Sequence, residues 1–120
     1  MLLGNFYQIL ETGQDGQTYR VKVAFNAAHE IFKGHFPDLP VVPGVCQTQM
    51  LIETLSQLLN RQLELKLAHH IKFLALLNPA KENTIELEIK IEKQEGEHLW
   101  VSAIYTSPAE TFFRFKGELC

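Results

Sequence analysis

A histidine and the start of a helix lie close together in one segment of this 120-residue chain, residues 32–45. The segment reads FKGHFPDLPVVPGV, and its three prolines restrain the backbone. His35 lies in the middle of it, and an imidazole that titrates near neutral pH can serve as a general base or acid. On residue type alone, a histidine that bonds the backbone of a proline-rich corner is the commoner case. The surrounding elements therefore decide whether His35 is catalytic.

The pattern after Val45 predicts a helix that begins just after Pro43-Gly44. Apolar residues recur there at three- and four-residue steps, which is the spacing of one helical face. These residues are Leu51, Ile52, Leu55, Leu58, Leu59 and Leu63. The amides from about Gly44 to Gln47 have no partner within such a helix, so they can receive a carbonyl oxygen that gains negative charge. A tethered histidine near a free helix N-terminus indicates carbonyl chemistry.

The opposite face of this predicted helix carries polar side chains. Gln49, Glu53 and Gln57 follow one another at one-turn intervals, with Ser56 and Asn60 beside them. A glutamic acid can deliver a proton, whereas a glutamine can hydrogen-bond a hydroxyl or a water but cannot act as an acid. Two interpretations of Glu53 stay open, a working acid and a solvated or interface carboxylate.

The remaining reactive side chains predict no metal site and no thiol nucleophile. Cys46 falls in the first helical turn, where thiol pKa values drop, but no partner base is identifiable and a packing role is favoured. His29, His69 and His70 do not show metal-ligand spacing. Because they are adjacent on a predicted strand, His69 and His70 would point to opposite faces. With Cys120 at the far end of the chain, both cysteines are expected to be free thiols.

Period-two alternation predicts an antiparallel sheet beside the one long helix, and thus an α+β fold in a single domain, residues 1–120. The alternation is clearest at 85–92. The other predicted strands are residues 19–25, 66–77, 99–106 and 111–119. Three N-terminal segments are less regular: 1–10 is a short helix or an edge strand, 11–17 a turn by composition, and 26–32 a short helical turn.

Composition excludes several classes of protein. Hydrophobic residues make up 46% and charged residues 21%, as in ordinary folded proteins. A net charge of −3 and scattered Lys and Arg provide no basic footprint for nucleic acid. No apolar run approaches the ~20 residues needed to span a bilayer, and no signal-peptide pattern is seen. A cytoplasmic location without membrane contact is expected.

Residues 34–45 resemble a known signature. The pattern GHFPxxPxxPGV is similar to that of the beta-hydroxyacyl-(acyl carrier protein) dehydratases, and residues 70–73 (HIKF) resemble the Lys/Arg-Phe strand of that family. The resemblance implies the hotdog fold, a long helix wrapped by an antiparallel sheet. It further implies that His35 works at the alpha carbon of the substrate, and that Gly44 and Val45 amides polarise the thioester carbonyl. Phe36 and Pro43 would contact the substrate.

The resemblance also implies partners. The substrate would be carried on the phosphopantetheine of acyl carrier protein, or on coenzyme A, with no metal or redox cofactor. In this family the site forms between two subunits, with histidine from one and the helix acid from the other. A homodimer or higher homo-oligomer is therefore expected.

One departure from the family pattern bears on activity. The family has Glu or Asp four residues after the valine and commonly Gln one turn later, whereas this chain has Gln49 and then Glu53. The predicted function is dehydration of (3R)-hydroxyacyl thioesters to trans-2-enoyl thioesters, in fatty-acid or polyketide-type synthesis. Two alternatives are kept: a hotdog acyl thioesterase, and a non-catalytic acyl-binding or heterodimer partner subunit.

Overall fold

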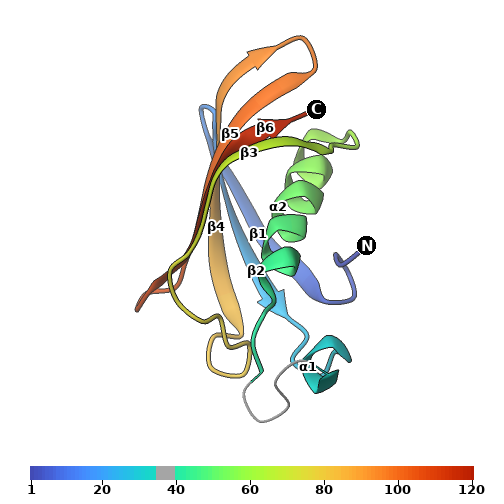
Figure 1. Ribbon diagram of the computed structural model, residues 1–120, viewed down its shortest axis with the longest axis vertical. Helices are drawn as coiled ribbons and strands as arrows, with labels where there is room; N and C mark the ends of the chain where they lie inside the picture. The colour runs from blue at the N-terminus through green and yellow to red at the C-terminus, as the bar shows by residue number, and fades with distance from the viewer. Residues whose placement is uncertain (35–39) are drawn as a thin grey trace.

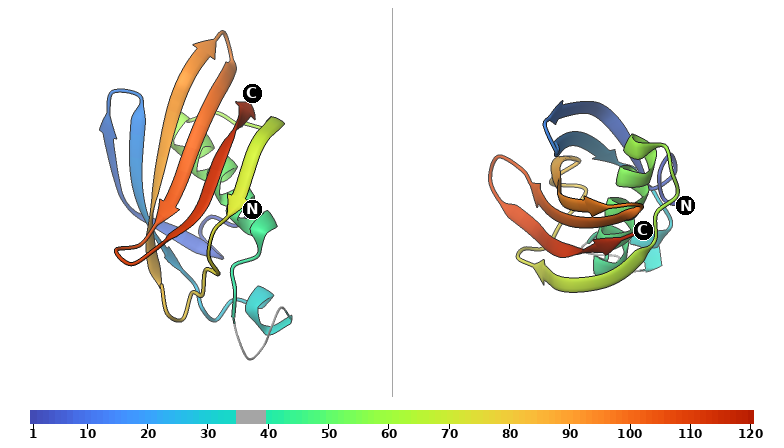
Figure 2. Two further views of the ribbon diagram at one scale, coloured as in Figure 1. Left: turned by 60° about the vertical axis from the view of Figure 1, so that its left-hand side comes forward. Right: turned by 90° about the horizontal axis from the view of Figure 1, so that it is seen from above.

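The computed structural model describes residues 1–34 and 40–120, and in this part of the chain a six-stranded antiparallel sheet curves around one long helix (Figure 1). The sheet order is β1-β2-β4-β5-β6-β3. In the view along the long axis of the molecule, the sheet curves around one side of α2 (Figure 2, right). The predicted α+β layout is confirmed. The elements are β1 Tyr7–Asp15, β2 Thr18–Phe25, α1 Ile31–Gly34, α2 Gly44–Leu59, β3 Leu65–Phe73, β4 Thr84–Glu95, β5 His98–Thr106 and β6 Thr111–Leu119.

The core lies between α2 and the concave face of the sheet. In β4 the alternation predicted from sequence is confirmed, because Ile85, Leu87 and Ile89 are buried and the intervening residues face outward. Met50, Leu51 and Leu55 of α2 are fully buried against them. Four aromatic residues complete this layer, namely Tyr105, Phe112, Phe113 and Phe115. The apolar face of α2 is thereby fixed toward the sheet, which leaves its polar face outside.

Helix α2 begins where the sequence predicts. Pro43 is its N-cap residue with extended backbone, and Gly44 is its first helical residue. The helix ends at Asn60, whose φ of 52° places it in the left-handed region that Asn tolerates better than most residues. The Asn60 amide donates to Gln57 O at 3.3 Å, which closes the last turn. Both ends of the helix are thus set by local sequence.

The predicted turn at residues 11–17 is wrong in extent. Strand β1 continues to Asp15, which pairs with Thr18, and only Gly16 and Gln17 form the hairpin turn. The φ of 61° at Gly16 requires a residue that adopts left-handed backbone easily. Since β1 is an edge strand exposed on most of its length, it carries the polar residues that a turn would also have. Residues 1–10 were predicted as either a short helix or an edge strand, and the structure shows an edge strand that begins at Tyr7.

The expectation that His69 and His70 point to opposite faces is also wrong. The pairing of β3 with β6 shifts between Ala68 and His70, which is a β-bulge. His69 bonds Glu118, and His70 lines a hollow with Lys116 on the same outer face. A bulge breaks the alternation on which the expectation depended.

No helix among the described residues is both long and apolar enough to cross a membrane.

Candidate active site

The first turn of α2 presents unpaired backbone amides. Its first helical hydrogen bond is donated by Gln47 N to Pro43 O, at 3.1 Å. Among the described residues, the amides of Gly44, Val45 and Cys46 have no backbone acceptor, and no side chain caps this end. Val45 is 78% exposed. These amides and the helix dipole can therefore stabilise a carbonyl oxygen that gains charge.

A ring from β3 fixes the space beside this turn. A Cβ atom added at Gly44 would lie 2.7 Å from Cζ of Phe73, closer than non-bonded carbons approach. Phe73 in turn packs on Phe113, with ring centroids 5.5 Å apart. Because Gly44 has no side chain, the ring of Phe73 can lie directly against the first turn of α2. Phe73 belongs to the HIKF strand that the sequence singled out.

Gln49 and Glu53 lie together one turn further along α2. Gln49 Nε2 donates to Glu53 Oε2 at 3.0 Å. Gln49 is exposed, whereas Glu53 is only 6% exposed, although the predicted helix placed both on the polar face. Burial of Glu53 comes from the N-terminal residues. The backbone N–H groups of Leu2 and Leu3 each donate to Glu53 Oε1 at 2.8 Å, and Leu2 also donates to Oε2 at 3.0 Å.

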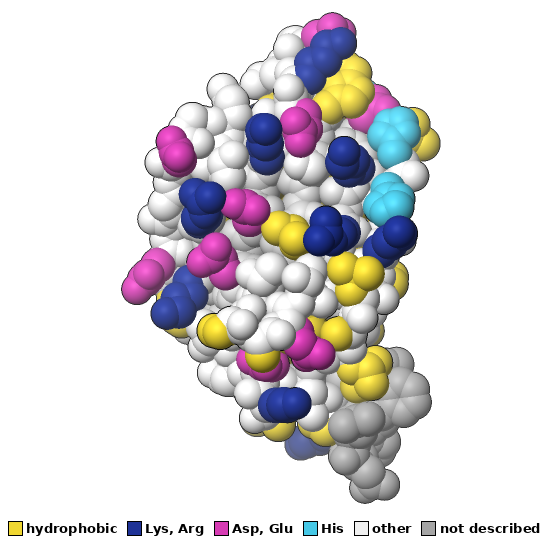
Figure 3. Space-filling view, turned by 90° about the vertical axis from the view of Figure 1, so that its left-hand side faces the viewer, with side chains coloured by type: hydrophobic (Ala, Val, Ile, Leu, Met, Phe, Trp, Pro, Cys, Tyr) yellow, Lys and Arg dark blue, Asp and Glu magenta, His cyan; other side chains and the backbone are white. Residues whose placement is uncertain are grey.

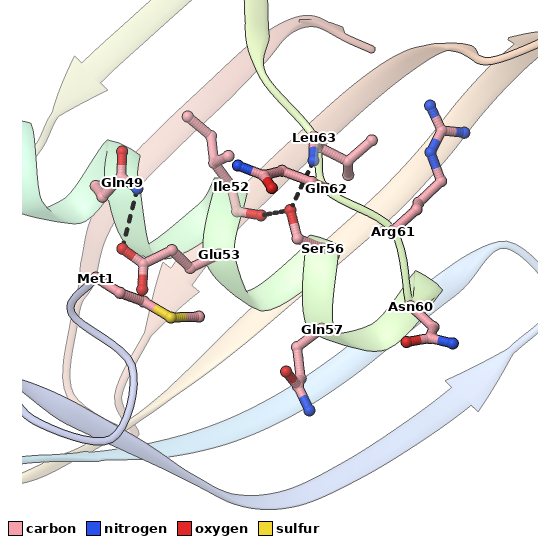
Figure 4. A pocket seen from close by; sticks show the side chains of 10 residues that line it. All are labelled: Met1, Gln49, Ile52, Glu53, Ser56, Gln57, Asn60, Arg61, Gln62 and Leu63. Atoms are coloured by element: carbon pink, nitrogen blue, oxygen red, sulfur yellow. Dashed lines mark hydrogen bonds between the residues drawn. The ribbon is translucent and has the colours of Figure 1, made fainter.

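A pocket of about 610 Å³, here called the α2 pocket, runs along this polar face (Figure 4). Four of its ten lining residues carry side-chain amides, and Met1 lies beside Glu53. Ser56 donates to Ile52 O at 2.6 Å and accepts from Leu63 N at 3.1 Å, which ties the end of the helix to the following loop. The lining residues are Met1, Gln49, Ile52, Glu53, Ser56, Gln57, Asn60, Arg61, Gln62 and Leu63.

Buried hydroxyl groups lie behind this face, in the core. The hydroxyls of Tyr7 and Thr54 are 2.9 Å apart, and Tyr7 also donates to Met50 O at 3.3 Å. Burial raises the pKa of Tyr7, and the charge of Glu53 adds to the effect. The pKa of the Cys46 thiol is raised by the same two causes. Cys46 is 8% exposed, and with a raised thiol pKa it fits packing rather than nucleophilic attack.

The structure brings some of the predicted site residues together. Gly44 and Val45 form the open helix start next to Pro43, and Gln49 and Glu53 form a hydrogen-bonded pair. Gln49 follows Gly44 by five residues, which is roughly 7.5 Å along a helix axis. His35 and Phe36 lie outside the described residues, so their predicted roles stay predictions. Among residues 1–34 and 40–120, no group of three or more potential ligands could hold a metal ion.

Sequence reasoning missed the contact between Glu53 and the N-terminus. Leu2 and Glu53 are separated by 51 positions, and the donors are backbone amides that no side-chain pattern reveals. The only available signal was the apolar character of the first ten residues, which predicts packing but no partner.

A second hydrogen-bonded group with a carboxylate, made of Glu118, His69 and His98, lies on the outer face of the sheet, away from α2. Figure 3 shows this face with its charged side chains. Glu118 of β6 bonds His98 Nε2 at 2.7 Å and His69 Nε2 at 2.5 Å. These hydrogen bonds, that of His98 first, lower the pKa of Glu118. Trp100 packs against His98 with ring centroids 4.5 Å apart and ring planes inclined at 52°. This cluster lies on the sheet face opposite the α2 pocket, so it has no part in the candidate site.

Solved structures similar to this chain share its fold. A chain of the dehydratase heterocomplex ApeI:P from Xenorhabdus doucetiae is 26% identical, with a TM-score of 0.76 over 93% of this chain and 96% of that chain. An uncharacterised protein from Erwinia carotovora subsp. atroseptica is 20% identical, with a TM-score of 0.65 and coverage of 93% and 91%. A candidate thioesterase from Shewanella oneidensis is 15% identical, with a TM-score of 0.52 and coverage of 94% and 80%. The latter two show the fold alone, and the hotdog fold is confirmed.

No curated protein sequence matches the chain. A family model described as ApeI dehydratase, the ApeI-like family, matches residues 11–107. This range covers most of the sheet and all of α2. The open start of α2 and the Gln49–Glu53 pair both fall inside it. The chain therefore belongs to the ApeI-like dehydratase family of hotdog proteins.

Proposed function

We propose that this protein removes water from (3R)-hydroxyacyl thioesters to give trans-2-enoyl thioesters. Membership of a dehydratase family supports the reaction class. The observation that carries the proposal is the open first turn of α2. Its amides have no partner among residues 1–34 and 40–120, and they lie one turn from the Gln49–Glu53 pair. Hydrogen-bond donors aimed at a thioester oxygen stabilise the negative charge that develops when the alpha proton is removed.

Each step of the proposed elimination has a group assigned to it. His35 takes the proton from the alpha carbon as general base, and the electron pair of that C–H bond forms the new double bond. The amides of Gly44 and Val45 hold the thioester oxygen meanwhile. The C–O bond at the beta carbon then breaks, its electron pair leaves with the hydroxyl oxygen, and that oxygen takes the proton that His35 accepted from the alpha carbon, so water is released. The Gln49–Glu53 pair is assigned to that hydroxyl.

The substrate is proposed to arrive on the phosphopantetheine of acyl carrier protein or on coenzyme A, as in fatty-acid or polyketide-type synthesis. A second hotdog subunit is proposed to complete the site. Strand β3 supports this, since it is the last strand of the sheet and every residue in it is exposed. Large apolar side chains gather there and beside the start of α2. They are Val45, Leu65, Leu67, Ile71, Phe73, Leu74 and Leu76.

The first test supplies the purified protein with a 3-hydroxyacyl thioester and, separately, with a saturated acyl thioester of the same length. Enoyl absorbance in the ultraviolet with the first substrate is the expected result. Substituting His35→Ala should reduce the rate about 100- to 10,000-fold, the usual contribution of a positioned base. His98→Ala, on β5 at the outer face of the sheet, is the matched control and should keep the wild-type rate. Thiol release from the saturated substrate without enoyl formation would indicate a thioesterase instead.

A second candidate function is a partner subunit without full activity of its own. Two observations favour it: Gln49 occupies the position of the family acid and cannot act as one, and the similar Xenorhabdus doucetiae chain belongs to a heterocomplex. Under this alternative the protein alone is inactive, and the double variant Gln49→Glu with Glu53→Gln gains dehydratase activity. The exchange keeps one acid and one amide, whereas Gln49→Glu alone would place two carboxylates in contact. An inactive wild type and an inactive double variant would together contradict the dehydratase proposal.

A further inference from the structure

In the described part of the chain, every hydrogen bond of Glu53 comes from an uncharged N–H group. Oε1 accepts from Leu2 N and Leu3 N, both at 2.8 Å, and Oε2 accepts from Leu2 N and Gln49 Nε2, both at 3.0 Å. An ionised carboxylate is an acceptor only, so this set of donors satisfies both oxygens. A proton on either oxygen would point at a group that also donates. Glu53 is therefore poorly arranged to deliver a proton to a substrate.

The donors from the N-terminus are held in place by their own backbone. Phe6 N donates to Leu2 O at 2.7 Å, and Gly4 N donates to Tyr7 O at 2.7 Å, so residues 2–7 form a closed turn. Leu2 and Leu3 also pack on the hydrophobic core. Because a hydrogen-bonded turn cannot easily move away, the Glu53 carboxylate is pinned from one side. Gln49 is on the other side.

The pinned carboxylate determines which end of the Gln49 amide faces outward. Only the NH₂ end of an amide can bond an acceptor-only carboxylate, so Nε2 must face Glu53. Figure 4 shows the Oε1 atom of Gln49 directed away from Glu53. Gln49 is exposed and lines the α2 pocket. The outward end of the Gln49 side chain is thus a carbonyl oxygen, which accepts hydrogen bonds and does not donate them.

We propose that Glu53 is a positioning residue that acts through Gln49. Its carboxylate, pinned by the amides of Leu2 and Leu3, presents Gln49 Oε1 as the acceptor for the beta-hydroxyl of a 3-hydroxyacyl thioester. The inference depends on the proposed function for the class of substrate, and it assigns Gln49 the recognition of the hydroxyl. A saturated acyl chain has no group to donate to this oxygen. The pair consequently selects hydroxylated over saturated chains.

Glu53→Gln breaks this arrangement in a defined way. The carbonyl oxygen of the introduced amide can still accept from Leu2 and Leu3, but its NH₂ group then faces Gln49. The Gln49 amide must turn over so that its Oε1 meets that NH₂ group, which exposes Nε2 to the pocket. Leu2→Pro removes a backbone donor and leaves the Glu53 side chain itself unchanged. Leu2→Ala keeps the donor and is the matched control for the loss of the Leu2 side chain.

The experiment measures binding rather than turnover. Pantetheine amides of a 3-hydroxyacyl chain and of a saturated chain of equal length are titrated into each protein, far below its melting temperature. We expect wild type and Leu2→Ala to prefer the hydroxylated ligand by about 2- to 12-fold, the value of one net hydrogen bond. Glu53→Gln exposes a donor in place of the acceptor, so a third ligand, a 3-methoxyacyl chain whose ether oxygen only accepts, should bind Glu53→Gln better than it binds wild type. Leu2→Pro should weaken the wild-type preference for the hydroxylated ligand. Affinity for the saturated ligand should stay within about twofold in all four proteins.

Three results would overturn the inference: no preference in wild type, a 3-methoxyacyl chain that binds Glu53→Gln no better than it binds wild type, or an equal loss of the hydroxylated and saturated ligands, which is the sign of a purely structural role. If Glu53→Gln does not fold, the comparison of Leu2→Pro with Leu2→Ala decides. A protein that shows the expected preference but no turnover would keep the inference and refute the dehydratase activity. A protein that binds neither ligand would refute both.

Discussion

Glu53 and Glu118 are two carboxylates on opposite sides of the same sheet, and they are satisfied by different chemistry. Glu53, 6% exposed, is held by three neutral N–H donors from backbone and amide. Glu118, with its side chain 16% exposed, is held by the imidazoles of His69 and His98. The number of contacts is similar, but the donors of Glu53 are backbone and amide N–H groups, whereas those of Glu118 are imidazoles.

This difference indicates different uses. A buried carboxylate held by backbone and amide donors keeps one geometry, which suits a group that must orient another side chain. The carboxylate between the imidazoles is more exposed to solvent, which screens its interactions. Substitutions in the two regions test the contrast, and the largest effect is expected at Glu53.

Glu53→Ala should reduce the free energy of unfolding by about 2 to 3 kcal/mol. The substitution leaves Leu2 N, Leu3 N and Gln49 Nε2 without their acceptor, and hydrogen bonds to charged groups contribute on the order of 1.5 to 3 kcal/mol. Urea denaturation at neutral pH measures the change. Gln57→Ala is the control, one turn further along the same face and exposed, with an expected change within about 0.5 kcal/mol. Equal effects of the two substitutions would show that the N-terminal contact is not stabilising.

Tyr7→Phe should destabilise the protein by about 1 kcal/mol, less than Glu53→Ala. The hydroxyl bonds Thr54 Oγ1 at 2.9 Å and Met50 O at 3.3 Å in the fully buried layer behind Glu53. Its loss removes neutral hydrogen bonds, which have smaller net values than those of a carboxylate. The control is Tyr19→Phe, because the Tyr19 hydroxyl only accepts an exposed bond from Gln14 at 3.3 Å. A loss larger than that of Glu53→Ala would place the stabilisation in the core hydroxyls rather than in the carboxylate.

Local patterns in the sequence were sufficient to predict the helix and the strand that position the candidate site. The start of α2 at Gly44 follows from a proline before a glycine and from the periodicity after it. The buried face of β4 follows from strict alternation. Both depend on residues close together in the chain, so the sequence predicts them without knowledge of the tertiary structure. The open amides at Gly44 and Val45 follow from the same start.

Contacts between distant residues could not be predicted in this way. Glu53 has the spacing of a solvated side chain, and only the arrival of Leu2 and Leu3 from 50 or more positions away buries it. The bulge between Ala68 and His70 likewise arises from pairing with β6 and places His69 on the outer face. In both cases a contact with a distant part of the chain, and not the local sequence periodicity, determines the burial or the orientation of the side chain. The sequence shows that Gln49 and Glu53 are one helical turn apart. It does not show that Gln49 is the exposed member of the pair and Glu53 the buried one.

Glu118→Gln tests the outer carboxylate and should have the smallest effect, confined to one range of pH. Hydrogen bonds from the two histidines lower the pKa of Glu118 in the folded protein below its ordinary value of 4.5. Its ionised form therefore stabilises the fold above that value, and the contribution is lost as the pH falls through the lowered folded pKa. The melting temperature of wild type should exceed that of Glu118→Gln at pH values above 4.5, and the gap should close at lower pH.

Glu86→Gln is the control for this last change, because Glu86 is exposed on the same outer face, and in the described part of the chain its side chain has no hydrogen bond. Melting curves for wild type, Glu118→Gln and Glu86→Gln across the acid range separate the cluster from the general loss of negative charge. A gap between wild type and Glu118→Gln that is the same at every pH would mean that the histidines do not act on the carboxylate. The two carboxylates would then differ in burial alone, and the contrast between amide and imidazole donors would have no energetic consequence.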